Sequence, residues 1–238
     1  MAAAKTVSLH MTELRPVNSG PYVAAPRGVD APAPWRWLDV ADVVERVVVL
    51  GLYANFAYRA LVGFTEHLSV VTVLLIVSEV LPVILIIFRG RARAMSLKPL
   101  DWMLAVAGTS APLLVKTTGV PVPLLSLDVC AAIMLAGIFT QVSAKVVLWR
   151  SFGIVAANRG VKVEGPYALV RHPMYLGYTI THLGFLLWHP SVRTFVFYAI
   201  ALSIQIARIM REEKVLMRDP GYEAYASRVC YRLIPGLF

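Results

Sequence analysis

Two groups of polar side chains in the second half of the sequence are suited to binding a single charged ligand. The first group is Arg171 and His172, which directly precede Pro173 and an apolar run. Proline suits the first turn of a helix, and the backbone N–H groups that a helix leaves unpaired at its start attract anions. We therefore expect an anion-binding turn here, with Arg171 and His172 adding positive or hydrogen-bond-donating groups.

The second group lies about forty positions later and consists of Arg208, Glu212 and Glu213. Arg208 and Glu212 are four residues apart, so they share one face of a helix. A ligand that carries an anionic end and a cationic or donor end would satisfy both groups. S-adenosylmethionine has such groups, and carboxylates and aromatic faces would favour its sulfonium. A phospholipid headgroup or a nucleotide also fits this description.

The composition is typical of a polytopic membrane protein. Of the 238 residues, 58% are hydrophobic and 16% charged, whereas soluble domains carry roughly a quarter charged residues. The net charge of +9 is explained by basic cytoplasmic loops and anionic headgroups. We expect no nucleic-acid partner, because no basic soluble module is present. Cys130 and Cys230 lie in no cluster with metal-ligand spacing, so we expect no metal site and no disulfide.

The hydropathy pattern predicts an all-α bundle of about six transmembrane helices, of which the last two form a helical hairpin. The predicted spans are about 40–62, 68–88, 100–115, 124–148, 174–188 and 193–210. After the last span the pattern stays helical up to Asp219-Pro220-Gly221 and is then polar with aromatic residues.

Three regions follow from this pattern. Residues 1–36 form a disordered tail, residues 37–148 hold four transmembrane helices, and residues 149–238 hold a cofactor-binding loop, the hairpin and a cytoplasmic segment. Basic residues gather after the second, fourth and sixth spans, which places both termini in the cytoplasm. The composition of the chain favours a bacterial inner membrane. The oligomeric state is left open.

Several polar residues interrupt the apolar spans. We expect Glu45 and Arg46 at the membrane interface, and Lys145 extended to the cytoplasmic surface. Glu79 falls near the middle of a span, where either a structural role or a place in a substrate pocket fits. His182 is expected to hydrogen-bond between the two hairpin helices.

A longer pattern then connects the two polar groups. It comprises Gly165-Pro166-Tyr167, Arg171-His172-Pro173-Met174-Tyr175-Leu176-Gly177, Arg208, Glu212-Glu213, Leu216, Gly221-Tyr222, Tyr225, Val229 and Ile234-Pro235. This combination, over about residues 150–238, resembles the family of isoprenylcysteine carboxyl methyltransferases and phospholipid methyltransferases. The resemblance implies an integral membrane enzyme that uses S-adenosylmethionine.

The resemblance also implies roles for individual residues. The cofactor would be bound by Val161, Lys162, Tyr167, His172, Pro173, Met174, Tyr175, Glu212 and Glu213. Arg208 would face the methyl acceptor, and we name Arg208 and Glu212 as the candidate catalytic residues. The acceptor would be lipophilic and arrive through the bilayer, as a phospholipid amine, an isoprenylated cysteine carboxylate or a small thiol or amine.

Two other functions remain as alternatives. Membrane sterol reductases, which use NADPH, share an Arg-His-Pro turn of this kind, although they carry Asn and Asp where this sequence has Met174 and Tyr178. The carboxylate pair Glu212-Glu213 favours methyl transfer. A non-enzymatic membrane scaffold is the third interpretation.

Overall fold

The computed structural model describes residues 35–63, 70–111 and 122–238. Most of the predicted N-terminal tail, residues 1–34, lies outside this part, and so does the side chain of Glu79. The described elements are α1 Trp35–Gly63, α2 Val70–Phe88, β1 Ala94–Met95, α3 Pro99–Ser110, α4 Leu127–Leu148, η2 Trp149–Ser151, β2 Ala157–Asn158, η3 Gly165–Ala168, α5 Pro173–Trp188, α6 Val192–Leu216 and α7 Pro220–Arg228.

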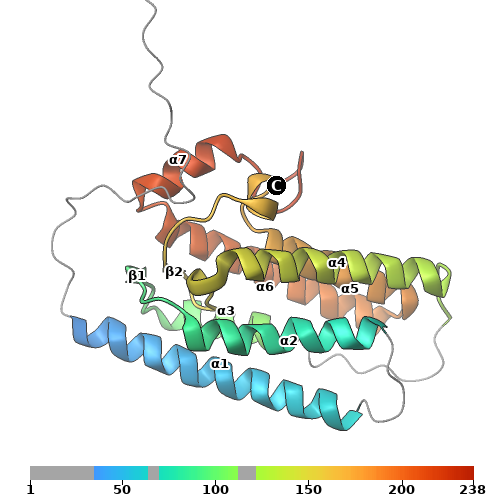
Figure 1. Cartoon of the computed structure of the whole chain (residues 1–238). Coiled ribbons are helices and arrows are strands. Elements are labelled where there is room, and N and C mark those ends of the chain that lie inside the picture. The colour runs from blue at the N-terminus through green and yellow to red at the C-terminus, as the bar shows by residue number, and fades with distance from the viewer. Residues whose placement is uncertain (1–34, 64–69, 112–121) are drawn as a thin grey trace, which may run out of the picture.

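The helices α1 to α6 run alternately in opposite directions, which brings distant loops to the same end of the bundle (Figure 1). At this end β1 pairs antiparallel with β2, with Ala94 opposite Asn158. Gly90 N–H also donates to Arg150 O at 2.8 Å. We call the end that carries residues 89–98, 149–172 and 217–238 the loop end. The helix α7 lies against it (Figure 1).

Two of the described helical segments have the length and apolar composition of a membrane span. They are Leu127–Ser151, with a mean hydropathy of 1.8, and Val192–Leu216, with a mean hydropathy of 1.4. The predicted helical fold class is therefore confirmed, and the six-span topology stays a prediction. The third predicted span, 100–115, is described only as the twelve residues of α3, and its remainder includes residues outside the described part.

The helix α5 packs most closely against α4, and the contact depends on glycine. A Cβ at Gly177 would lie 2.5 Å from the backbone nitrogen of Gln141, and one at Gly184 would lie 2.7 Å from the Met134 side chain. Small residues at such a contact allow two helices to approach closely. The predicted hairpin partners α5 and α6 make fewer close contacts, and at His182 the contact is between rings. His182 stacks on Tyr198 with centroids 4.5 Å apart, where a hydrogen bond was expected.

The chain after α6 contains a helix that the sequence analysis did not predict. The helical pattern was expected to end at Asp219-Pro220-Gly221, but α7 begins at Pro220. The Asp219 carboxylate accepts a hydrogen bond from Gly221 N–H at 2.8 Å and so caps the helix. An aspartate followed by proline is a local start signal, which the sequence interpretation did not use.

The expectation that Lys145 reaches the surface is wrong. Its side chain is fully buried, and Nζ donates to Ser78 O at 2.8 Å and to Ser78 Oγ at 3.1 Å. The ammonium also lies 5.2 Å from the ring centroid of Tyr178. Lys145 faces α2 and α5, where a carbonyl, a hydroxyl and an aromatic face satisfy its charge, so the side chain has no need to extend to water.

Candidate functional site

The turn before α5 is bound by the last residues of the chain. The N–H of Arg171 donates to Tyr231 O at 2.9 Å, and the N–H of His172 donates to Arg232 O at 2.8 Å. The helix starts at Pro173 as predicted, and the backbone N–H groups of Arg171 and His172 are used within the chain. Their partners are carbonyls some sixty positions away, which the local sequence does not reveal.

Glu213 holds this arrangement together. Its carboxylate lies 2.7 Å from Arg232 Nε, 3.3 Å from Arg171 Nε and 3.3 Å from His172 Nε2. The residue is buried, and each of its neighbours comes from the turn or from the C-terminal segment. Glu213 therefore fixes the turn and the end of the chain to α6.

Glu212 has different surroundings. Tyr175 donates a hydrogen bond from its hydroxyl to Glu212 Oε1, and His172 Nδ1 lies 3.8 Å from Oε2. The side chain keeps 20% of its surface exposed. The two polar groups of the sequence thus meet at the loop end, one carboxylate on each side of the His172 ring.

A cleft opens beside Glu212 at the loop end. It has about 750 Å³ of empty space, including its opening to solvent. Seven of the nine residues predicted to bind a cofactor line it: Val161, Lys162, Tyr167, His172, Met174, Tyr175 and Glu212. The other two, Pro173 and Glu213, do not line it.

Four tyrosines line this cleft, and one of them has an unused hydroxyl. The Tyr222 hydroxyl is buried and has no hydrogen-bond partner within the described part of the chain. Burial raises the pKa of Tyr222 above its ordinary value, and burial likewise raises the pKa of Tyr167. Both phenols are therefore neutral at physiological pH. A buried, unpaired hydroxyl in a cleft is costly unless a ligand or water pairs with it.

The loop over the cleft is fixed by side-chain amides and carboxylates. Asn158 Nδ2 donates to Asp219 Oδ2 at 2.6 Å, and Asn158 Oδ1 accepts from Gly160 N–H at 2.9 Å. Gly160 has a φ of +103°, a conformation that a residue with a side chain rarely adopts. These contacts join β2, the loop that carries Val161 and Lys162, and the start of α7.

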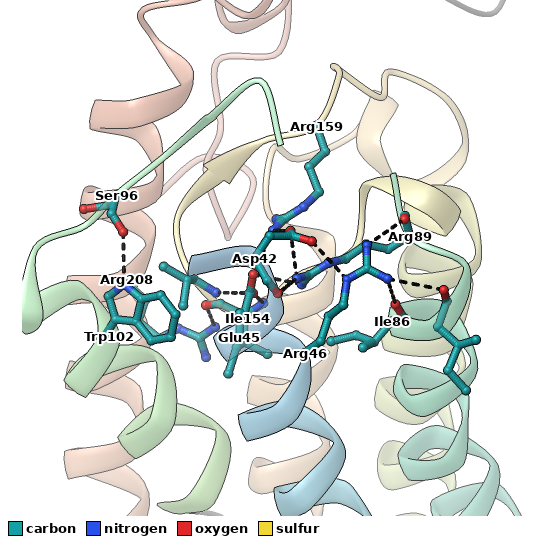
Figure 2. A network of polar contacts seen from close by, with 12 residues as sticks. Asp42, Glu45, Arg46, Ile86, Arg89, Ser96, Trp102, Ile154, Arg159 and Arg208 are labelled. Atoms are coloured by element: carbon teal, nitrogen blue, oxygen red, sulfur yellow. Dashed lines mark hydrogen bonds and ion pairs between the residues drawn. The ribbon is translucent and has the colours of Figure 1, made fainter. Parts of the chain in front are cut away.

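A buried charge network supports the far side of the loop (Figure 2). The Glu45 carboxylate lies 2.8 Å from Arg89 Nη1 and 2.7 Å from Arg159 Nη2. It also accepts the N–H groups of Ile154 and Val155 at 2.7 and 2.9 Å. Glu45 is fully buried within the protein, and its expected depth at the membrane interface stays a prediction.

Asp42 and Arg46 complete this network at the start of α1. Asp42 pairs with Arg46 Nε at 2.9 Å and with Arg89 Nη2 at 2.8 Å, and Arg46 also donates to Ile86 O at 3.2 Å (Figure 2). Because Arg46 is only partly exposed and its head group bonds α2, it does not extend freely into an interface. The network ties α1, α2 and the segment before β2 together.

Arg208 lies behind the cleft and does not line it. Its Nη2 donates to Ile154 O at 2.8 Å and is 3.8 Å from Glu212, and the guanidinium lies 5.2 Å from the centroid of the Tyr175 ring. Its side chain crosses Gly108 of α3, where a Cβ would meet Arg208 Cδ at 2.8 Å. Arg208 therefore positions Glu212, Tyr175 and the segment at Ile154.

The sequence interpretation missed several residues of this site. Arg159 and Tyr222 line the cleft, and Glu45 holds the segment that forms one of its walls. Tyr222 belonged to the recognised pattern but carried no assigned role. A distinguishing feature, its unpaired hydroxyl, appears only in three dimensions.

A helical protein with a polar cleft at one end of apolar helices fits a membrane-associated enzyme that binds a small charged cofactor. The family model for phospholipid methyltransferases matches residues 127–222. This segment covers α4, α5 and α6 and most residues of the cleft. The resemblance to this family is thereby confirmed, and it indicates a membrane methyltransferase. No curated protein and no solved structure matches the chain significantly.

Proposed function

We propose that this protein is an integral membrane methyltransferase that uses S-adenosylmethionine, and that its acceptor is a phospholipid amine. The observation that supports this most is the cleft in which the His172 turn and Glu212 meet, within a segment that matches the phospholipid methyltransferase model. The cytoplasmic placement of the loop end and a bacterial inner membrane remain part of the proposal.

The residues around the cleft suit the proposed cofactor. Glu212 supplies a negative charge, and the ring of Tyr175 lies beside it, so a sulfonium is favoured there. Lys162 and Arg171 supply positive charge for the carboxylate of an amino acid. The unpaired hydroxyl of Tyr222 would donate to or accept from a ribose or amino group.

The environment of Arg208 favours an amine over a carboxylate as the acceptor. A carboxylate acceptor would need a cation in addition to Lys162 and Arg171, which the proposal assigns to the cofactor carboxylate, but the Arg208 guanidinium is buried and already bonds Ile154 O beside Glu212. An ammonium needs a base to remove its proton, and the only carboxylate that lines this cleft in the described part of the chain belongs to Glu212.

In the proposed reaction the bound cofactor supplies an electrophilic methyl carbon. The acceptor ammonium gives its proton to Glu212, its nitrogen forms a bond to the methyl carbon, and the carbon–sulfur bond breaks. The products are a methylated ammonium, a thioether and a protonated Glu212, so charge balances at +1 on both sides. The side chains around the cleft align the two reactants and exclude water.

The proposal is tested with methyl-labelled S-adenosylmethionine and purified protein in vesicles. We expect label in the lipid fraction when phosphatidylethanolamine is present and none when it is replaced by phosphatidylcholine. Parallel arms offer an isoprenylated cysteine carboxylate and a lipophilic thiol. Label in one of these arms and none in phosphatidylethanolamine would overturn the acceptor assignment. Binding of NADPH without binding of S-adenosylmethionine would favour the reductase alternative.

A further inference from the structure

A second cleft lies at the loop end, between the segment that leads into α3 and the last two turns of α6. It has about 1000 Å³ of empty space, including its opening to solvent. Four basic residues line it, Lys98, Arg211, Lys214 and Arg218, together with one carboxylate, Asp101. Four positive charges and one negative charge leave a local net charge of +3.

Three of these cations are available to a ligand. The side chains of Lys98, Lys214 and Arg218 form no hydrogen bond or ion pair with the residues that the structure describes. The Asp101 carboxylate already has two partners within the protein: Arg211 Nε lies 3.3 Å from its Oδ1, and Ser96 donates a hydrogen bond to its Oδ2. The carboxylate therefore offsets Arg211 and leaves the positive charge of the other three residues uncompensated.

The backbone adds to this positive charge. Lys98 directly precedes Pro99, the first residue of α3, and the start of a twelve-residue helix carries a partial positive charge. Lys214 lies in the last turn of α6 and Arg218 in the turn that directly follows the helix, and both line the cleft. The cleft is thus surrounded by positive groups from both helices.

The surroundings of the cleft are apolar. Leu97, Leu100 and Met103 expose 54%, 47% and 67% of their surfaces at the start of α3. The candidate membrane span in α6 ends at Leu216, between Lys214 and Arg218. The cleft therefore lies at the depth where a span ends and lipid headgroups begin, and basic residues there attract anionic lipids.

We propose that this cleft binds the phosphate of an anionic phospholipid, with the acyl chains along Leu97, Leu100 and Met103. It is separate from the cofactor cleft, because the residues that α6 contributes differ: Arg211, Lys214 and Val215 here, Glu212 and Leu216 there. A net negative headgroup is favoured over a zwitterionic one by the charge of +3. The inference uses the membrane placement of α6 and does not depend on methyl transfer.

The test compares two variants of the full chain that lose the same charge. The first is Lys98→Gln, Lys214→Gln and Arg218→Gln together, and the control is Arg150→Gln, Arg193→Gln and Arg228→Gln at exposed positions outside both clefts. Binding of fluorescent phosphatidylglycerol is measured in neutral detergent micelles. Each basic residue near a headgroup contributes roughly a fivefold change in affinity. We therefore expect at least about tenfold weaker binding in the first variant and less than about twofold in the control.

Three results would overturn the proposal. Equal weakening in both variants would mean general electrostatic attraction, and equal binding of phosphatidylcholine would remove the preference for an anionic headgroup. Full displacement of the lipid by millimolar inorganic phosphate would identify a soluble phosphate ligand instead. Binding of S-adenosylmethionine is measured on the same samples and should be unchanged in the first variant, so a failure of the proposed function is recognised separately.

Discussion

Two adjacent carboxylates at the end of α6 have separate tasks. Glu213 is buried among Arg171, His172 and Arg232, so its charge is used within the protein. Glu212 lines the cleft and stays partly exposed. The two glutamates are adjacent in the sequence but differ in role. Glu213 supports the fold, and Glu212 faces the proposed ligand.

At the same scale, Tyr222→Phe tests whether the unpaired hydroxyl contacts the cofactor. A neutral hydrogen bond contributes about 0.5–1.5 kcal/mol, so we expect an affinity for S-adenosylmethionine about two- to tenfold lower. The free protein should keep its thermal stability, because the hydroxyl has no partner to lose. Tyr231→Phe, at a partly exposed tyrosine outside the cleft, is the control. Unchanged affinity in Tyr222→Phe would remove this contact from the site.

At the scale of elements, the charge network of Glu45 joins α1 and α2 to a wall of the cleft. Glu45 bonds the N–H groups of Ile154 and Val155, and the neighbouring carbonyl of Ile154 bonds Arg208. One side chain on α1 thereby positions both Val155, which lines the cleft, and Arg208 behind it. The network couples the first helix of the described chain to the site.

Glu45→Gln should weaken cofactor binding although Glu45 lies outside the cleft. The change removes one of the two carboxylates that Arg89 and Arg159 share, because Asp42 remains, and losing a partner in a buried ion pair costs up to about 3–5 kcal/mol. We expect a lower thermal midpoint and at least about a tenfold loss of affinity for S-adenosylmethionine. The control is Asp39→Asn, at an exposed carboxylate of the same helix. A Glu45→Gln variant that loses stability but binds S-adenosylmethionine with normal affinity would show that the network supports only the fold and not the cofactor site.

The close packing of α4 against α5 at Gly177 can be tested by substitution. Gly177→Ala would place a Cβ 2.5 Å from a backbone nitrogen of α4, which has no means of moving away alone. Overpacking of this kind costs about 1–3 kcal/mol. In Gly51→Ala the new Cβ meets nothing within 4 Å, so stability should hold or rise. Thermal melts in detergent compare the two; equal midpoints would contradict the close packing.

The parts of this site that sequence predicts are those with local signals. Pro173 and the apolar run after it fix the start of α5, and seven of the nine residues that the resemblance predicted to bind a cofactor line one cleft. The surroundings of Glu45 and Lys145 were not predictable in this way. Their partners, Arg159 and Ser78, come from segments more than sixty residues away. From the sequence alone, an isolated charge in an apolar span is equally consistent with a buried ion pair and with a position at the membrane interface.

For the whole molecule, the alternating helices bring the connecting segments together at the loop end (Figure 1), and residues of these segments line both clefts. Cys230 is exposed at this end, whereas Cys130 is buried in α4. If the loop end faces the cytoplasm, a membrane-impermeant maleimide should label the protein in inside-out vesicles and leave it unlabelled in intact cells. Cys230→Ser should abolish this labelling. Labelling from outside would place both clefts on the other side of the bilayer.

Equilibrium binding of radiolabelled S-adenosylmethionine to the purified chain tests the central claim most directly. The account predicts one saturable site, displaced by the thioether product and not by NADPH. Glu212→Ala should lose this binding while retaining a cooperative thermal melt, and Glu223→Ala, at an exposed carboxylate of α7, should retain it. Absence of saturable binding to the folded protein, or equal binding in Glu212→Ala, would contradict the assignment of this cleft to the methyl donor.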